Sequence, residues 1–139
     1  MGLDQYAYKV RAGEQLEYTQ REHIVEIAYW RKHNRLQGWM ENRWIEKGRP
    51  NPQINEDGTP REDFNCVNME LSWEDIIALT ESIDNRTLPE TGGDFFGADS
   101  YDWKKSNGDY EDLQHDLEFI EMAKLVLDTG DKVVYSSWY

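Results

Sequence analysis

The sequence has little of several features that would assign it to a functional class. Its 139 residues include one cysteine, Cys66, so no internal disulfide can form, which fits a reducing compartment. No apolar run approaches the length of a membrane-spanning helix. The first residues lack the basic and apolar segments of a signal peptide. We therefore expect a protein that neither crosses nor enters a membrane.

Basic residues are also scarce. Against 28 Asp and Glu there are 15 Lys and Arg, which gives a formal net charge of -13. Such a balance argues against general nucleic-acid binding through a basic surface and disfavours contact with anionic membranes. Two interpretations remain open. The acids form a well-solvated surface, or they form a DNA-like or basic-partner-binding face.

Catalytic signatures are absent as well. The glycine-bracketed segment 92–97 lacks the lysine and spacing of a phosphate-binding loop, and it does not match a dinucleotide fingerprint. Asp112, His115 and Asp116 share one helical side, but no second histidine or cysteine stands at zinc-ligand spacing. No serine or cysteine has a partner base that the sequence identifies. We assign no catalytic residue, metal or cofactor.

What the chain does contain is aromatic residues. They make up 13% of the sequence, with 6 Trp and 8 Tyr, although the hydrophobic fraction is 38% and the mean hydropathy is -0.89. A disordered chain would be poor in aromatics, so we expect a core built from few, large side chains. The length and the absence of a linker or repeat favour one domain over residues 1–139.

Periodicity predicts the order of elements. Alternating or β-branched runs predict four strands, at residues 3–10, 24–29, 64–71 and 133–138. Helical spacing predicts a helix from Trp30 or Arg31 to Glu46, a second behind Ser72, and a third that Asn107 or Asp109 caps. This order predicts an α+β fold, a small mixed or antiparallel sheet of about four strands with three helices packed on it.

The helix faces follow from spacings of three and four. In the first helix we expect a buried stripe and a water-facing side with Arg31 and Arg35. The expected stripe consists of His33, Leu36, Met40 and Trp44.

In the second helix, Ser72 and Asp75 have the spacing of a capping box. A single buried face is expected to carry Trp73, Ile76, Ile77, Thr80 and Ile83.

A basic, aromatic stretch stands out in the acidic chain, with seven basic against four acidic residues between Arg21 and Arg49. Cations and a helix N-terminus can hold an anion, and tryptophan can stack a base. Two alternatives remain, because the cations can neutralise acidic helices nearby and His33 can be a core residue. The glycine-bracketed loop can line a pocket or plug the core. The predicted ligand-binding residues are Trp30, Lys32, His33, Asn34, Trp39, Arg43, Phe95 and Phe96.

Several patches carry a resemblance over nearly the whole chain. They are Met1-Gly2-Leu3-Asp4-x-Tyr6, Tyr29-Trp30-Arg31-Lys32-x-Asn34-x3-Gly38-Trp39, Leu71-Ser72, Leu88-Pro89-x-Thr91-Gly92-Gly93-x-Phe95-Phe96-Gly97, Tyr101-Asp102 and Tyr135-Ser136-Ser137-Trp138. In these the chain resembles a family of small uncharacterised bacteriophage and prophage proteins, some of them labelled phosphoglycerate kinase. That label fails, because 139 residues cannot form the two large lobes of such a kinase. The resemblance implies a viral origin and the host cell cytoplasm, and no particular reaction.

Three hypotheses follow for the function. The leading one is a non-enzymatic phage accessory protein that binds a small anionic, nucleotide-like ligand in an aromatic and basic pocket. The second is an acidic protein-interaction module that acts on a host protein. The third is a small hydrolase or transferase with His33 or Asp94 as its base. The sequence leaves open whether the chain forms a homo-oligomer.

Overall fold

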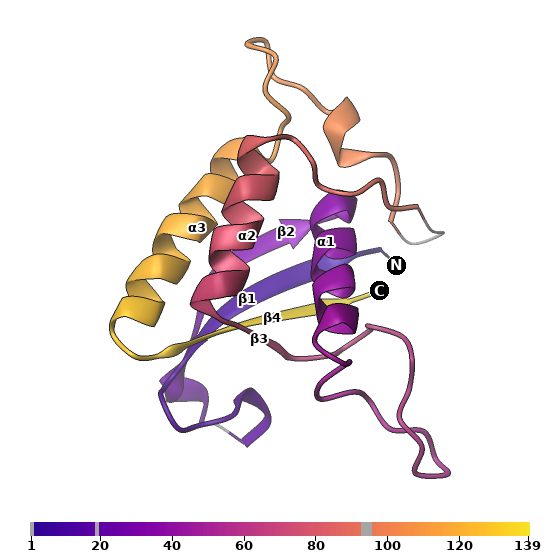
Figure 1. The fold of residues 1–139 in the computed structure, drawn as a ribbon, viewed down its shortest axis with the longest axis vertical. Coiled ribbons are helices and arrows are strands. Elements are labelled where there is room, and N and C mark those ends of the chain that lie inside the picture. The colour runs from indigo at the N-terminus through magenta and orange to yellow at the C-terminus, as the bar shows by residue number, and fades with distance from the viewer. Residues whose placement is uncertain (1, 19, 93–95) are drawn as a thin grey trace.

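The computed structural model describes residues 2–18, 20–92 and 96–139 (Figure 1). Four strands form one antiparallel sheet in the order β2-β1-β4-β3. The strands are β1 (Asp4–Val10), β2 (Ile24–Arg31), β3 (Met69–Leu71) and β4 (Lys132–Trp138). This confirms the predicted α+β class and resolves the sheet as antiparallel.

Three helices cover one face of this sheet, as Figure 1 shows. They are α1 (Asn34–Glu46), α2 (Trp73–Asp84) and α3 (Leu113–Asp128). Short turns of 3-10 helix, η1 (Leu16–Tyr18), η2 (Arg21–His23) and η3 (Ser100–Asp102), lie in the connections. No α-helix of the described residues covers the opposite face of the sheet, and we call it the outer face.

The core lies between the sheet and the helices. The predicted α1 stripe is confirmed, because His33, Leu36, Met40 and Trp44 are each at most 1% exposed. Trp44 packs on Phe64 at a centroid distance of 5.1 Å, and Phe64 stacks on Tyr135 of β4 at 6.1 Å. Large aromatic side chains thus bridge α1 to the sheet, as the composition predicted.

Three predicted boundaries are wrong. The third helix is not capped by Asn107 or Asp109, because α3 begins at Leu113 with Asp112 at its N-cap position. β2 does not give way to a helix at Trp30, because Trp30 and Arg31 still pair with Gln5 and Asp4 of β1. The chain turns at Lys32, whose φ is 62°, and α1 begins at Asn34. The third strand is also shorter than predicted, because Cys66 has a left-handed φ of 61° and interrupts it before Met69.

Two predicted faces also need correction. Trp73 and Ile77 are 43% and 53% exposed, because α2 packs through Ile76, Leu79 and Ile83 instead. The apolar residues of α2 occupy two adjoining sides of the helix, and only the side with Ile76, Leu79 and Ile83 packs against the core. Arg35 does not face water, because it forms an ion pair with Asp99 at 2.6 Å. The capping box at Ser72 is confirmed, with both of its hydrogen bonds present.

Candidate functional site

Three strand ends meet at one corner of the sheet. Asp4 at the start of β1 pairs with Arg31 at the end of β2 and, on its other side, with Trp138 at the end of β4. Alternation along β2 sends Trp30 into the core and leaves Tyr29 and Arg31 on the outer face. The Arg31 side chain is 58% exposed and Trp138 is 64% exposed. A cation and a tryptophan therefore stand in solvent on the same face.

Lys32 adds a second cation at this corner. Its left-handed backbone is rare for a residue with a long side chain and costs about 1–3 kcal/mol at a typical site. The conformation is held by a hydrogen bond from the Lys32 N–H to the Leu3 carbonyl, 2.9 Å long. Strained backbone conformations of this kind are often found at active sites and ligand-binding sites.

Two glycines make room for the Lys32 side chain. A methyl group built on Gly2 would lie 2.9 Å from Lys32 Cε, 3.8 Å from its Nζ and 3.4 Å from Arg31 Nη2. A methyl group on Gly97 would lie 3.4 Å from Lys32 Cδ and 3.9 Å from Nζ. The two cationic head groups therefore flank one point beside the Gly2 backbone. We call Gly2, Arg31, Lys32, Gly97 and Trp138 the basic corner.

The charges of the basic corner are only partly compensated. Arg31 Nε lies 3.9 Å from Asp4 Oδ1, and that oxygen also accepts a 2.6 Å hydrogen bond from the Tyr29 hydroxyl. The hydrogen bond to Asp4 raises the pKa of Tyr29, so the phenol stays a donor. Among the described residues, no ion pair engages the Lys32 ammonium. Two cations thus face one carboxylate in a protein whose net charge is -13.

The interior fixes the position of this corner. The Gln5 side chain accepts from the His33 N–H at 2.8 Å and donates to the His33 carbonyl at 3.0 Å. Gln5 is itself fully buried and also hydrogen-bonds the Tyr135 hydroxyl at 3.0 Å. The backbone that directly follows Lys32 is thereby tied to β1 and β4, which restricts where the lysine can point.

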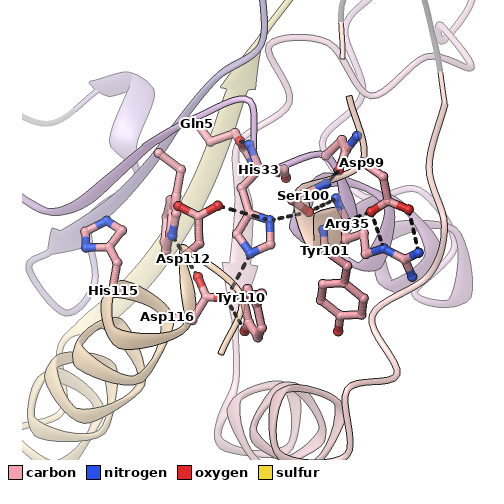
Figure 2. A network of polar contacts seen from close by, with 12 residues as sticks. Gln5, His33, Arg35, Asp99, Ser100, Tyr101, Tyr110, Asp112, His115 and Asp116 are labelled. Carbon is pink, nitrogen blue, oxygen red and sulfur yellow. Dashed lines mark hydrogen bonds and ion pairs between the residues drawn. The ribbon is translucent and has the colours of Figure 1, made fainter. Parts of the chain in front are cut away.

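Behind the corner lies a buried polar network, shown in Figure 2. Asp116 accepts hydrogen bonds from Trp30 Nε1 at 2.9 Å, His33 Nε2 at 2.8 Å and the Tyr110 hydroxyl at 2.6 Å. His33 Nδ1 lies 3.1 Å from Ser100 Oγ. The carboxylate can only accept, so Nε2 carries a proton, and Nδ1 lies within hydrogen-bonding distance of the Ser100 hydroxyl. We call these five residues the histidine network.

Burial shapes the ionisation of this network. Burial, with the neighbouring Asp116 carboxylate, raises the pKa of Tyr110, so the phenol is neutral at all ordinary pH values. Asp112 lies 3.9 Å from His33 Nδ1. Burial raises the pKa of Asp112, although the charge of His33 acts in the opposite direction.

The chain from Ser100 through His33 to Asp116 has the connectivity of a hydrolase triad. Ser100, His33 and Asp116 are 1%, 0% and 1% exposed, and they line none of the five main hollows of the described residues. A nucleophile must reach its substrate, so this geometry favours a structural role. No sequence pattern indicated Ser100, because it lies 67 positions from His33.

The eight predicted ligand-binding residues are not gathered in one pocket. Trp30, His33 and Asn34 are buried with their polar groups paired, because the end of β2 and the start of α1 face the core. The Asn34 amide donates to the Ala98 carbonyl at 2.8 Å and accepts from the Ser100 N–H at 2.9 Å. It therefore anchors a connection and does not face solvent.

The remaining predicted residues lie in two other places. Trp39 and Arg43 line a hollow of about 360 Å³ between α1 and α2, where Trp39 donates to Ser82 and Arg43 to Asp75. Lys32 and Phe96 lie at the basic corner, where Phe96 packs edge-on against Tyr139 at 5.1 Å. Phe95, and Asp94 of the hydrolase hypothesis, are outside the described residues. Arg31 and Trp138 were not among the predicted site residues.

Two kinds of feature are absent from the described part of the chain. No group of three or more histidine, cysteine, aspartate or glutamate residues there is arranged to hold a metal ion. No helix there has the length and apolar character needed to cross a membrane.

Comparisons with known proteins add no assignment. A scan against protein-family models, a search of curated proteins and a search of solved structures each gave no match to this chain.

Proposed function

We propose that this protein is a non-enzymatic binding protein whose basic corner takes a small anionic, nucleotide-like ligand. The observation that carries the proposal is the convergence of the Arg31 and Lys32 head groups on one point beside Gly2. Two cations that lie close to one point repel each other, and an anion bound at that point would offset the repulsion. Asp4 supplies only one negative charge, at 3.9 Å from Arg31.

The aromatic surroundings favour a ligand with a planar group. Trp138 is exposed on the same face of the sheet, and Tyr6 packs against Tyr29 with centroids 5.1 Å apart. A phosphate would accept from the Arg31 guanidinium and the Lys32 ammonium, and a base would stack on the Trp138 ring. An arginine-phosphate contact gives direction as well as charge, because the guanidinium presents a fixed fork of donors.

The resemblance to small phage and prophage proteins supplies the setting of the proposal. On that resemblance the protein acts in the cytoplasm of an infected bacterium, as an accessory protein that binds a host metabolite or signal. The small-hydrolase hypothesis receives less support, because its base His33 is enclosed and already hydrogen-bonded.

Isothermal titration at low salt against a panel of nucleoside monophosphates, triphosphates and cyclic nucleotides tests the proposal. We expect one member to bind with measurable heat. Arg31→Gln with Lys32→Gln should then weaken it by at least tenfold, because charge-assisted hydrogen bonds contribute about 1.5–3 kcal/mol each.

The matched control is Lys104→Gln with Lys105→Gln, which removes two charges from the exposed connection before α3. This control should leave the affinity unchanged. The proposal fails if no member of the panel gives heat, or if both double variants weaken binding equally.

A further inference from the structure

The far end of the outer face of the sheet carries two adjoining hollows, away from the basic corner. Their volumes are about 400 and 750 Å³, and they share Leu16 and Asn68 as lining residues. We call them together the acidic groove. Its lining residues include Tyr8, Leu16, Glu17, Glu22, Glu26 and Asn68.

The walls of the groove are fixed by specific contacts. Residues 14–17, which include η1, and Glu22 of η2 form one side. Lys132 Nζ donates to the Glu14 carbonyl at 2.9 Å, and the Ala12 N–H donates to Asp131 at 3.1 Å. Glu17 accepts from the Asn51 and Asn68 amides at 2.8 and 2.7 Å. The groove is therefore preorganised, so little ordering is needed when a partner binds.

The charge of the groove is negative. Five of its lining residues are glutamates and two are lysines. Both lysines are already engaged. Lys47 is paired with Asp75 and donates to the Glu70 carbonyl, and Lys132 lies 3.3 Å from the Glu70 carboxylate. Burial alone would raise the pKa of Glu17, but hydrogen bonds from Asn68 and Asn51 lower it, so this carboxylate stays ionised.

Two of the glutamates are open to a partner. Glu22 and Glu26 are exposed, and no ion pair engages them among the described side chains. Burial raises the pKa of the Tyr8 phenol, and the negative charge of nearby Glu26 raises it further. Tyr8 itself stacks on Tyr6 with centroids 6.0 Å apart, so its ring forms a rigid apolar floor beside the carboxylates.

We propose that the acidic groove binds an extended cationic segment of a partner protein, with lysine or arginine side chains as its anchors. The aliphatic stem of such a side chain would lie on Tyr8 and Leu16, and its charged end would meet Glu22 and Glu26. An anionic ligand is excluded from this end by charge. A second copy of this chain is disfavoured, because each copy carries a net charge of -13.

This inference is independent of the proposed function, because the two surfaces share no residue. Fluorescence anisotropy with a labelled peptide of alternating lysine and serine tests it, with glutamate replacing lysine in a matched peptide. Saturable binding of the basic peptide at low salt is expected, with no binding of the acidic one. The Arg31→Gln and Lys32→Gln double variant should bind the basic peptide as the wild type does.

Glu22→Gln with Glu26→Gln should weaken the basic peptide roughly tenfold, since two charge contacts of about 0.7 kcal/mol each are lost. The matched control is Glu118→Gln with Glu121→Gln on α3, which covers the other face of the sheet. This control should change the affinity by less than about twofold. Equal weakening by the two double variants, absence of saturation, or reversible self-association seen instead by sedimentation would overturn the inference.

Discussion

At the scale of single residues, the protein concentrates polar groups in its interior. Asp116 is 1% exposed and accepts three hydrogen bonds, from an indole, an imidazole and a phenol. A buried carboxylate is tolerated only when its oxygens are satisfied in this way. The histidine network therefore links β2, α1 and α3 through one side chain, and it fixes the backbone that follows Lys32.

Removing one donor from this network should be costly. Tyr110→Phe deletes the 2.6 Å hydrogen bond to Asp116, and the phenol ring is 2% exposed. We expect the free energy of unfolding to fall by about 1–3 kcal/mol, because water cannot replace the lost donor.

Urea unfolding followed by circular dichroism measures this loss. Tyr29→Phe is the matched control, since it deletes a hydroxyl that donates to Asp4 at the exposed surface. The control should change stability by less than about 0.5 kcal/mol. Equal losses in the two variants would show that the network contributes no more than a surface hydrogen bond.

At the scale of elements, Asp75 joins two helices. It completes the capping box of α2 by accepting from the Ser72 N–H at 2.8 Å. It also accepts from Arg43 of α1 at 2.7 Å and from Lys47, just after that helix. Burial alone would raise the pKa of Asp75, but these hydrogen bonds outweigh burial and hold the pKa below its ordinary value of 3.8.

The sign of the pH dependence follows from that direction. A carboxyl group whose pKa is lower in the folded than in the unfolded state stabilises the fold at pH values above its unfolded pKa, here 3.8. This stabilisation is lost as the pH falls through the folded-state pKa. Asp75→Asn should lower the free energy of unfolding by about 1–3 kcal/mol at pH 7, because it removes the ionic partner of Arg43 and Lys47. The loss is no larger because both cations are partly exposed and can be hydrated again.

Urea unfolding at a series of pH values follows the difference between wild type and Asp75→Asn. The difference should shrink as the pH falls below 3.8, when Asp75 of the wild type also becomes neutral. Asp84→Asn, at the exposed end of the same helix, should show no such trend. A difference that stays constant down to about pH 2 would exclude an ionised Asp75 as its source.

At the scale of the whole molecule, charge is unevenly distributed. The net charge is -13, yet the basic corner gathers two cations at one end of the sheet. The acidic groove lies toward the other end of the same face. The outer face thus presents opposite charges at its two ends, with tyrosine rings between them. Both proposed binding surfaces lie on this face, and the core lies on the opposite face, between the sheet and the helices.

Such a net charge should make stability depend on salt. We expect the melting temperature at pH 7 to rise between roughly 20 and 500 mM sodium chloride, because screening relieves repulsion among the acids. Near the sequence pI of about 4.5 the same addition should have little effect. Differential scanning calorimetry measures both series. A melting temperature that falls with salt at pH 7 would mean that attractive ion pairs outweigh the repulsion.

The sequence by itself determined the order of elements, the α+β class, the buried stripe of α1 and the capping box at Ser72. Each of these depends on residues within a few positions of one another, where periodicity and local hydrogen bonds act. The predicted ligand-binding residues cluster around Trp30 and Lys32, but the sequence could not separate those that face solvent from those that face the core.

The tertiary structure decided everything that depends on distant partners. β2 continues through Arg31 because β1 offers it Asp4, a pairing that no local pattern encodes. His33 meets Asp116 across 83 positions. The basic corner exists because Gly2 and Gly97 leave space for one lysine. Strand register and packing set these contacts, and both are properties of the folded chain as a whole.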